Sequence, residues 1–503
     1  MAGRNRPVIV ASQGDGVGTA YFLRLARSVA RDIRRGRLRA GEPLPGSRSL
    51  AVSLEVNRNT VVAAYRELAL EGWVVVRPGG GTFVADDLPD VRRRSLRGAA
   101  ASGHSAEAMA RVPGFALRPE RAGASAGPPL THAPGVLVMA GGVPDVRLLP
   151  AALLARAYRR VLSSPGAKGL LTYGDPRGDA QLRSAVATMA REARGVPASA
   201  EHVLVTRGSQ MALELIARAV VPEGGTVAVE GVGYPPAWSA FQRSGARVVP
   251  VPVDAHGIVV AEVAKLASEG APSLLYVTPH HQYPTTVTLS HGRRAELLEL
   301  ARTARFAIVE DDYDHELHYD GRPVLPLASA DGRGSVIYVG TLSKVLAPGL
   351  RLGYVIAPTP LIDRLARDRF VVDRQGDHVV ERAAAELIDD GTVARHVRKA
   401  KRIYEQRRDL LVDALTSTFG GLLEVKRPSG GMTLWVRVRA SGELVVRWEA
   451  RALAGGVSFA AGQRFAFDGR AIPHARFGFA MLDEREIREA VRRLANAWRD
   501  GGR

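Results

Sequence analysis

The stretch VGTLSKVLAPGLR, residues 339–351, decides how we interpret the rest of the chain. It continues an apolar run that begins at Ser335 and has the composition of a buried strand. One lysine, Lys344, stands among small and hydroxyl side chains, and Arg351 follows seven positions later. A lysine in a loop is usually solvated. Lysine is scarce in this chain, however, and its position directly after an apolar strand favours a chemical role.

The composition indicates a chain with more than one buried core. Of its 503 residues 46% are hydrophobic, so at least two domains are expected. No apolar run is long enough to cross a membrane, and the first ten residues lack the apolar segment of a signal peptide. Cysteine is absent, which excludes disulfides and thiolate metal sites. We expect a cytoplasmic protein with no membrane partner.

The net charge of +18 favours a polyanionic partner, although an arginine-rich proteome would give the same excess. The placement of the charge is therefore more informative than its size. Residues 1–86 contain thirteen arginines, no lysine and seven acidic residues, which is a formal charge of +6. This charge makes the N-terminal region the first place to look for a nucleic-acid contact.

The first 86 residues show three helical patterns followed by a hairpin. Apolar residues at spacings of three and four predict an amphipathic helix over 20–36. Ser47 is a plausible N-cap of a short second helix, and a third helix ends at Gly72. Two strands, 73–77 and 82–85, then flank a glycine-rich turn. This order predicts a winged helix-turn-helix domain over residues 1–86, with the buried residues Leu23, Ala26, Val29, Ala30, Ile33, Leu50, Ala51, Leu54, Val61, Ala64, Tyr65 and Leu68.

The start of the third helix would contact DNA in such a domain, because a recognition helix places its N-terminal residues in the major groove. Arginine binds guanine in a bidentate manner, asparagine does so with adenine, and threonine suits a phosphate or a methyl group. A glycine in the wing lets the backbone approach a phosphate closely. The alternative is a small helical packing domain with solvated arginines. The residues predicted to contact a double-stranded DNA operator are Arg48, Asn57, Arg58, Asn59, Thr60 and Gly80.

Residues 87–134 differ in character from the sequence on either side. Pro, Gly, Ala and Ser dominate, several arginines are interspersed, and neither helical nor strand periodicity is sustained. We interpret this stretch as a flexible basic linker, too rich in small and polar residues to build a core. Its arginines either contact DNA phosphates or belong to a solvated tether, and both interpretations stay open.

Residues 135–503 alternate apolar strand-like runs with helical patterns. Near-continuous apolar strands separated by helices predict an α/β domain with a mostly parallel sheet covered on both faces. Ligands bind such sheets at the carboxyl ends of the strands, and polar residues gather at those ends here. The expected strands are residues 202–206, 226–230, 246–251, 273–278, 306–311, 335–340 and 353–357.

The polar residues at these strand ends suit a flat cofactor with a phosphate group. Gly208 and Ser209 open a helix, and its free N–H groups and hydroxyl fit a phosphate, although Gly-Ser also simply starts helices. Tyr234, after the next strand, can stack on a flat ring or simply pack within its loop. Asp311 ends a third strand, where a protonated pyridine nitrogen would compensate its buried charge, and Tyr313 can hydrogen-bond a ring oxygen.

Lys344 completes this set, because its amine would lie beside an aldehyde carbon and form a Schiff base with it. Thr341, Ser343 and Arg351 around it can bind the phosphate. We therefore predict pyridoxal 5'-phosphate (PLP) as the cofactor, with Lys344 as its catalytic attachment point. A metal site is the rival explanation for the acidic run after the strand. We find no adjacent ligand set beyond His315, and predict no metal.

Two sets of motifs resemble known families. PLPGSRSLA (43–51), NRNTVVAAYRELALEGW (57–73) and GGGTFV (79–84) resemble the GntR class of winged-helix regulators. The second set resembles the aspartate-aminotransferase-like fold, PLP fold type I. With both sets, the whole chain resembles the MocR/GabR group of PLP-dependent GntR regulators. The motifs of the second set are GGVPD (141–145), LTYGDPRG (171–178), RGSQMAL (207–213), PHHQYP (279–284), EDDYD (310–314), GTLSKVLAPGLRLGY (340–354) and ARFGFA (475–480).

The resemblance implies roles for individual residues. Lys344 would form the internal aldimine, Tyr234 would take the stacking position, and the other ring contacts would be those described above. Tyr173 matches a tyrosine that reaches the phosphate of the neighbouring subunit, which implies a domain-swapped homodimer. Arg476 matches an arginine that binds a substrate carboxylate, by preference in a bidentate manner. The residues implied at the phosphate are Ser209, Gln210, Thr341 and Arg351.

Two positions depart from the family pattern. Ordinary aminotransferases carry Asn-Pro-x-Gly where this chain has YPTT at 283–286, so Tyr313 is expected to hold the ring oxygen alone. The GABA-sensing member has an arginine two residues past the stacking tyrosine, and here that position is Pro236. We therefore expect an effector that differs from GABA or is bound differently, with Arg476 as its carboxylate anchor.

Two functions stay open on the sequence. The first is a DNA-binding transcriptional regulator that senses a small amino compound, or PLP itself, through aldimine exchange at Lys344. The second is an aminotransferase with an accessory DNA-binding head, in which Lys344 acts as the base for a proton shift. A PLP-binding repressor that does no chemistry is a variant of the first. The complete winged helix favours regulation, and residual transamination is compatible with it.

Overall fold

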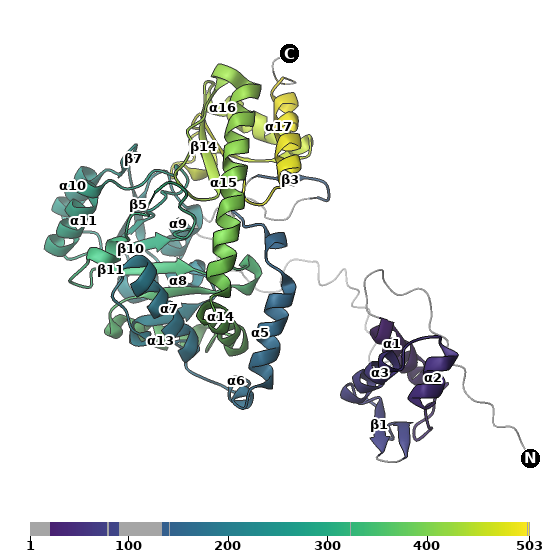
Figure 1. Cartoon of the computed structure of the whole chain (residues 1–503). Coiled ribbons are helices and arrows are strands. Elements are labelled where there is room, and N and C mark those ends of the chain that lie inside the picture. Colours follow the sequence, from purple (N-terminus) through teal and green to yellow (C-terminus); the bar gives the residue numbers. More distant parts are fainter. Residues whose placement is uncertain are drawn as a thin grey trace, which may run out of the picture. The chain divides into compact units, whose positions relative to one another are not determined.

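The computed structural model describes residues 21–77, 80–89, 133–139, 141–321, 323–499 and 501 (Figure 1). Contacts divide the chain into two compact units, Met1–Arg118 and Pro119–Arg503. Most of the predicted linker lies outside the described residues, so its flexibility and the predicted domain boundaries stay predictions. No helix in the described part of the chain is long and apolar enough to span a bilayer.

The first unit has the predicted order of three helices and a hairpin. Its helices are α1 (Tyr21–Arg34), α2 (Ser47–Ser53) and α3 (Arg58–Leu70). Strands β1 (Val74–Arg77) and β2 (Gly81–Val84) pair in antiparallel fashion. The helix-turn-helix with a wing is therefore confirmed. The core that joins the five elements contains Leu25, Val29, Ile33, Leu50, Val61, Ala64, Tyr65, Leu68, Trp73 and Val84.

Two details predicted for this unit are wrong. Ser47 is the first residue of α2 rather than its N-cap, and the N-cap position is occupied by Gly46. The Ser47 hydroxyl instead accepts a hydrogen bond from Nε of Arg58 at 3.4 Å. On α1, Leu25 is buried and Leu23 is only partly so. The cause is that Leu25, with the residues four and eight positions later, forms the row that faces the core, and Leu23 lies at its flank.

The second unit is built on a seven-stranded sheet of order β4-β12-β11-β10-β9-β5-β6. Strand β12 pairs in antiparallel fashion with β11 and β4, and the other pairs are parallel. The mostly parallel sheet is therefore confirmed. Its strands are β4 (Val203–Thr206), β5 (Thr226–Glu230), β6 (Arg247–Val251), β9 (Leu274–Val277), β10 (Ala307–Asp312), β11 (Val336–Thr341) and β12 (Gly353–Ile356).

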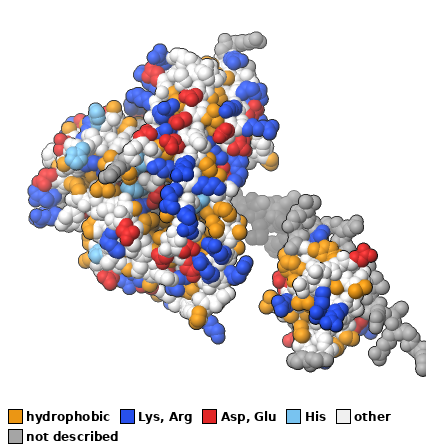
Figure 2. Space-filling view, in the orientation of Figure 1, with side chains coloured by type: hydrophobic (Ala, Val, Ile, Leu, Met, Phe, Trp, Pro, Cys, Tyr) orange, Lys and Arg blue, Asp and Glu red, His pale blue; other side chains and the backbone are white. Residues whose placement is uncertain are grey.

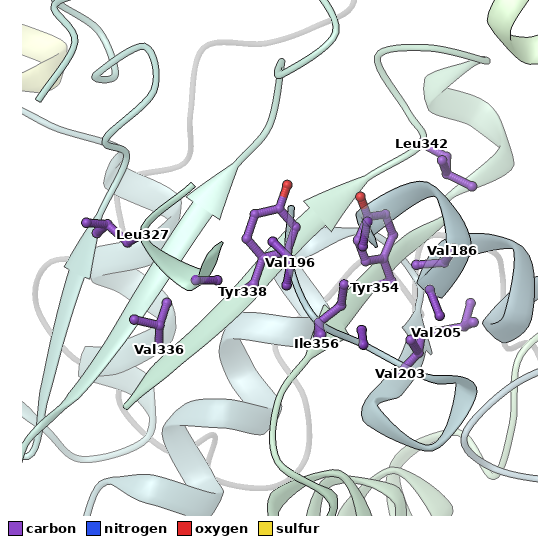
Figure 3. Close-up of a cluster of buried hydrophobic side chains, with 14 of the residues drawn as sticks. Val186, Val196, Val203, Val205, Leu327, Val336, Tyr338, Leu342, Tyr354 and Ile356 are labelled. Atoms are coloured by element: carbon purple, nitrogen blue, oxygen red, sulfur yellow. The ribbon is translucent and has the colours of Figure 1, made fainter. Parts of the chain in front are cut away.

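Helices cover both faces of this sheet, as its alternating side chains require. In β11, Val336 and Tyr338 belong to one core and Ile337 and Val339 to another. Figure 3 shows part of the first core, where the Tyr338 and Tyr354 rings lie beside each other among valines. The helices of the first core include α5 (Ala151–Ser163), α7 (Ala180–Arg194), α11 (His291–Ala304) and α14 (His378–Asp389), and those of the second are α8 (Ser209–Val220), α9 (Pro235–Arg243) and α13 (Thr359–Val372).

The C-terminal part of the second unit forms a smaller lobe with its own core. A four-stranded sheet of order β13-β14-β17-β16 packs with α15, α16 and α17 around the buried Trp448. Figure 1 shows α15 as a long helix that runs from the large sheet into this lobe. The elements are α15 (Thr392–Phe419), α16 (Gly442–Ala454), α17 (Glu484–Arg499), β13 (Leu423–Glu424), β14 (Thr433–Val438), β16 (Ala460–Ala461) and β17 (His474–Gly478).

Basic side chains gather on the exposed face of α15. Figure 2 shows them over the middle of the second unit. The exposed basic residues are Arg395, Arg398, Lys399 and Arg402. Because they recur at spacings of three and four positions, they lie on one face of the helix.

Candidate functional site

The predicted site residues meet at the carboxyl ends of four strands. Helix α8 starts directly after β4, Tyr234 follows β5, Asp311 lies at the end of β10, and Lys344 follows β11. Parallel strands bring these ends to one edge of the sheet, which is where α/β proteins bind their ligands. The local patterns of the sequence are sufficient to place this group of residues.

Lys344 lies inside the site with its amine held by a distant part of the chain. Its Nζ donates a hydrogen bond to the carbonyl of Gly142 at 2.7 Å. Burial and the positive charge of Arg476 together lower the pKa of Lys344 to about 8, against the effect of Asp314 and Asp311. An amine with this pKa has a substantial neutral fraction near neutral pH, which a nucleophilic lysine requires.

Asp311 offers an unused buried acceptor. One carboxylate oxygen, Oδ2, accepts a hydrogen bond from the hydroxyl of Tyr276 at 2.8 Å. The other, Oδ1, is buried and has no hydrogen-bond partner in the described part of the chain. Burial, together with the charges of Asp312 and Asp314, raises the pKa of Asp311 to about 7, against the effect of the Tyr276 hydrogen bond. A protonated ring nitrogen would satisfy this oxygen, so the residue fits its predicted role.

The start of α8 and the turn after β11 form a close-packed cradle. Gly208 is the N-cap of α8 with φ of 79°, and a Cβ there would lie 2.8 Å from a nitrogen of Arg351. The Arg351 guanidinium donates to the carbonyl of Arg207 at 3.1 Å. The hydroxyl of Ser343 is buried without a partner among the described residues. Backbone N–H groups at a helix start, a guanidinium and a free hydroxyl are the groups that hold a phosphate, and Ser209 supplies the first N–H of the helix.

Two residues predicted at the phosphate have side chains engaged with the backbone. The Gln210 amide donates to the carbonyl of Pro236 at 2.8 Å. The Thr341 hydroxyl donates to the carbonyl of Leu352 at 3.2 Å and accepts from the N–H of Ser343 at 3.1 Å. These bonds fix the loops that surround the cradle.

Arg476 reaches the site from β17 of the smaller lobe. It is 3% exposed, and its guanidinium carbon lies 4.4 Å from the ring centroid of Tyr283. Within the described residues, its Nε has no hydrogen-bond partner and its guanidinium forms no ion pair. A buried guanidinium without a counter-ion is costly, and a ligand carboxylate would compensate its charge.

Aromatic rings line the wall between Arg476 and the sheet. Tyr234 meets Tyr283 edge to face with centroids 5.0 Å apart, and Tyr283 also contacts Phe465 at 5.6 Å. The Tyr313 hydroxyl donates to the carbonyl of His281 at 2.8 Å. Tyr313 would therefore have to turn away from this carbonyl to donate to a ring oxygen. Tyr283, which stands where ordinary aminotransferases have asparagine, places an aromatic ring against Arg476.

Tyr173 lies apart from this cluster on the surface. It is 78% exposed, and the guanidinium carbon of Arg374 lies 4.1 Å from its ring centroid. The same guanidinium lies 4.6 Å from the ring of Phe370, which is 49% exposed.

The predicted DNA contacts lie at the surface of the first unit. Arg48, Arg58, Asn59 and Gly80 are exposed, and Thr60 is partly so. Asn57 is also exposed but precedes α3 as its N-cap, where its side chain accepts a hydrogen bond from the N–H of Asn59 at 2.8 Å. The first turn of α3 therefore carries Arg58 and Asn59 outward, as a recognition helix requires.

Sequence reasoning missed three residues of the site. Tyr276 binds Asp311, Gly142 binds Lys344, and Tyr283 packs on Arg476. Tyr276 resembles any buried strand residue. Gly142 lies in the motif GGVPD, but 202 positions separate it from Lys344, so no local pattern signals that the two meet. The signal for Tyr283 was its place in a motif, where an aromatic residue replaces the usual asparagine.

Comparison with known proteins agrees with this description. Residues 134–494 match the family "Aminotransferase class I and II", and residues 23–84 match "Bacterial regulatory proteins, gntR family". The probable rhizopine catabolism regulatory protein MocR of Rhizobium meliloti is 32% identical over 93% of this chain and 91% of its own length. The pyridoxine biosynthesis regulator PdxR of Corynebacterium glutamicum is 31% identical over 79% of each chain. The α-aminoadipate aminotransferase LysN of Thermus thermophilus, solved with a phosphopyridoxyl-leucine adduct, superposes with a TM-score of 0.67 at 30% identity, over 73% of this chain and 93% of LysN.

A winged-helix head and an aminotransferase-type PLP domain in one chain define a PLP-dependent transcriptional regulator. The chain belongs to the MocR-type regulators, which join a gntR-family head to a domain of the class I and II aminotransferase family.

Proposed function

We propose that the second unit senses a small amino compound, or PLP itself, and that Lys344 is the group on which the signal acts. When bound, PLP supplies an aldehyde carbon that amines attack and a ring that withdraws electrons. The observation that carries the proposal is the arrangement around Lys344. Its amine, with a lowered pKa, interacts electrostatically with Asp311, which has an unpartnered oxygen, and with the guanidinium of Arg476, which is unpaired as far as the described residues show.

Each group in this pocket has a separate task. Asp311 would accept a hydrogen bond from the ring nitrogen of PLP, and the start of α8 with Arg351 and Ser343 would hold its phosphate. Arg476 binds the carboxylate of an amino-acid effector. A carboxylate on Arg476 also cancels part of the positive charge that lowers the pKa of Lys344. A bound carboxylate would therefore stabilise the free Lys344 amine as an ammonium ion, which is not a nucleophile.

The head reads a double-stranded DNA operator with the first turn of α3. Arg58 and Asn59 are exposed there, and arginine and asparagine are suited to base edges in the major groove. The effector changes DNA affinity only if it binds two conformations of the chain differently. Because such a regulator acts where the DNA is, we place it in the cytoplasm.

The test measures DNA affinity and cofactor absorbance in the same samples. The full chain, loaded with PLP, is mixed with labelled DNA from its own upstream region and titrated with a panel of amino acids and amines. We expect one class of amine to shift the visible absorbance and the DNA affinity together. Lys344→Ala should lose both responses, and the exposed Lys265→Ala should keep them. A chain that binds this DNA no better than random DNA contradicts the proposal.

We also propose a homodimer in which Tyr173 reaches the partner's site. Support comes from an exposed apolar patch around Tyr173, which a monomer has no reason to keep. Light scattering should give the mass of two chains, and Val371→Asp should halve it. A wild-type monomer would refute the dimer. The patch contains Leu171, Tyr173, Phe370, Val371 and Val372, which are 69%, 78%, 49%, 84% and 52% exposed.

Transamination is the second candidate, and the complete pocket favours it. Lys344, Asp311 and Arg476 are the groups that such chemistry needs, and LysN shares the fold at 30% identity. Steady-state turnover of an amino donor with a keto acid at ~1 s⁻¹ or faster would make catalysis the main activity. We expect slower turnover, because the head gives the same pocket a regulatory output.

A further inference from the structure

Four histidines meet in the buried interior of the second unit. His280 and His281 follow β9, and His315 and His318 follow β10, the strand that pairs with β9. The ring centroids of His280 lie 4.3 Å from His281, 4.9 Å from His315 and 5.6 Å from His318. All four rings are buried, with exposed fractions of 3%, 1%, 4% and 7% in chain order.

Three of these residues present ligand atoms to a common point. One ring nitrogen from each of His280, His281 and His318 lies within 4.8 Å of the other two. Nε2 of His281 and Nδ1 of His318 are 3.5 Å apart, which is long for a hydrogen bond. Two nitrogens bound at 2.0–2.1 Å to one tetrahedral zinc ion are about 3.3 Å apart, so this pair already has the spacing of two zinc ligands.

His280 has no other explanation among its neighbours. Both of its ring nitrogens are buried and lack a hydrogen-bond partner in the described part of the chain. A buried imidazole without hydrogen-bond partners is costly.

The surroundings orient the other ligands and balance the charge. Nδ1 of His281 is 2.9 Å from Oδ1 of Asp314, an arrangement that directs Nε2 toward the cluster, as carboxylates do for metal-binding histidines. His315 is 3.0 Å from Asp312, so a second carboxylate lies close by. Gly430 keeps this region open, because a Cβ there would lie 2.4 Å from Nε2 of His281.

We propose that His280, His281 and His318 form a trihistidine site for a divalent transition-metal ion of the zinc type, with Asp314 as the outer carboxylate. Three imidazoles suit such an ion, and a water molecule would complete the tetrahedron. The site revises our sequence interpretation, which found no ligand set beyond His315. Since the Tyr313 hydroxyl binds the carbonyl of His281, the ion would brace the wall of the cofactor pocket.

The test uses the full chain without any histidine tag, loaded with PLP so that the cofactor phosphate is already engaged. The protein is incubated with zinc chloride, dialysed into zinc-free buffer and analysed for metal. We expect about one zinc ion per chain. His280→Gln and His318→Gln should each lose it, and Asp314→Asn should bind zinc roughly 10–100-fold more weakly. His291→Gln, an exposed histidine outside the cluster, should retain it.

Two results overturn the proposal: a wild-type chain that keeps no zinc, and cluster variants that keep as much as the wild type. X-ray absorption at the zinc edge of the loaded wild type provides a test that depends on no variant. Imidazole scattering with nitrogens at 2.0–2.1 Å is expected. A shell of oxygens without imidazole would place the ion elsewhere and refute the site.

Discussion

The charge of Arg476 should control how readily Lys344 reacts. The pKa of Lys344 is about 8 against an ordinary value of 10.5, with burial as the largest cause and Arg476 as the next. At pH 7, about one amine in ten is neutral when the pKa is 8, but about one in 3,000 when it is 10.5. The low pKa therefore gives Lys344 most of its reactivity at physiological pH.

Arg476→Met removes the charge and keeps a side chain of similar length. Burial accounts for the largest part of the decrease and Arg351 for a smaller one, so we expect the pKa of Lys344 to rise by ~1 unit in the variant. Because the neutral amine is the nucleophile, the capture of added PLP at pH 7 should become ~10-fold slower. The rate should still increase with pH, but around a higher midpoint.

The assay follows the visible absorbance of the lysine-bound cofactor after PLP is mixed with the cofactor-free chain at a series of pH values. The wild-type rate should rise through a midpoint near 8 and then level off. Arg470→Met is the matched control, because that side chain lies on the same lobe and is 69% exposed. A wild-type midpoint near 10, or equal midpoints in the wild type and Arg476→Met, would show that our electrostatic reasoning is wrong.

Three further predictions concern the carboxylate and the head. Arg58→Ala should weaken binding to the specific operator by ~1–3 kcal/mol in a titration of labelled DNA, and an equal loss on random DNA would make Arg58 a phosphate contact. The folded chain binds a proton at Asp311 up to a pKa of about 7 and the unfolded chain only to about 3.8, so ionisation costs the cofactor-free protein stability as the pH rises between these values. Asp311→Asn should therefore raise the free energy of unfolding of the cofactor-free protein at pH 8 by ~1–3 kcal/mol in urea melts. A stabilisation at pH 8 no larger than that at pH 4 would contradict this. Asn57→Ala should destabilise the head by ~1 kcal/mol through the lost N-cap, and Asn57→Ser should restore most of it, whereas equal melts for all three chains would exclude the cap.

Much of the fold could be predicted because its signals are local. Seven apolar runs predicted the seven strands of the large sheet, and the residues after them predicted the site edge. The buried row of α3, Val61, Ala64, Tyr65 and Leu68, follows from helical periodicity alone. The prediction failed at Ser47. Its residue type suits an N-cap, but the helix begins one residue earlier than predicted, so Gly46 takes the N-cap position.

The sequence by itself determined which kinds of unit this chain contains and where Lys344 stands, because strand, turn and helix starts depend on neighbouring residues. The tertiary structure alone decided what Lys344 meets. Packing brings Gly142 to its amine across 202 positions, brings Arg476 from another lobe, and joins His280 and His281 to His318 across two parallel strands. These contacts depend on how buried faces fit together, and no spacing along the chain encodes that fit.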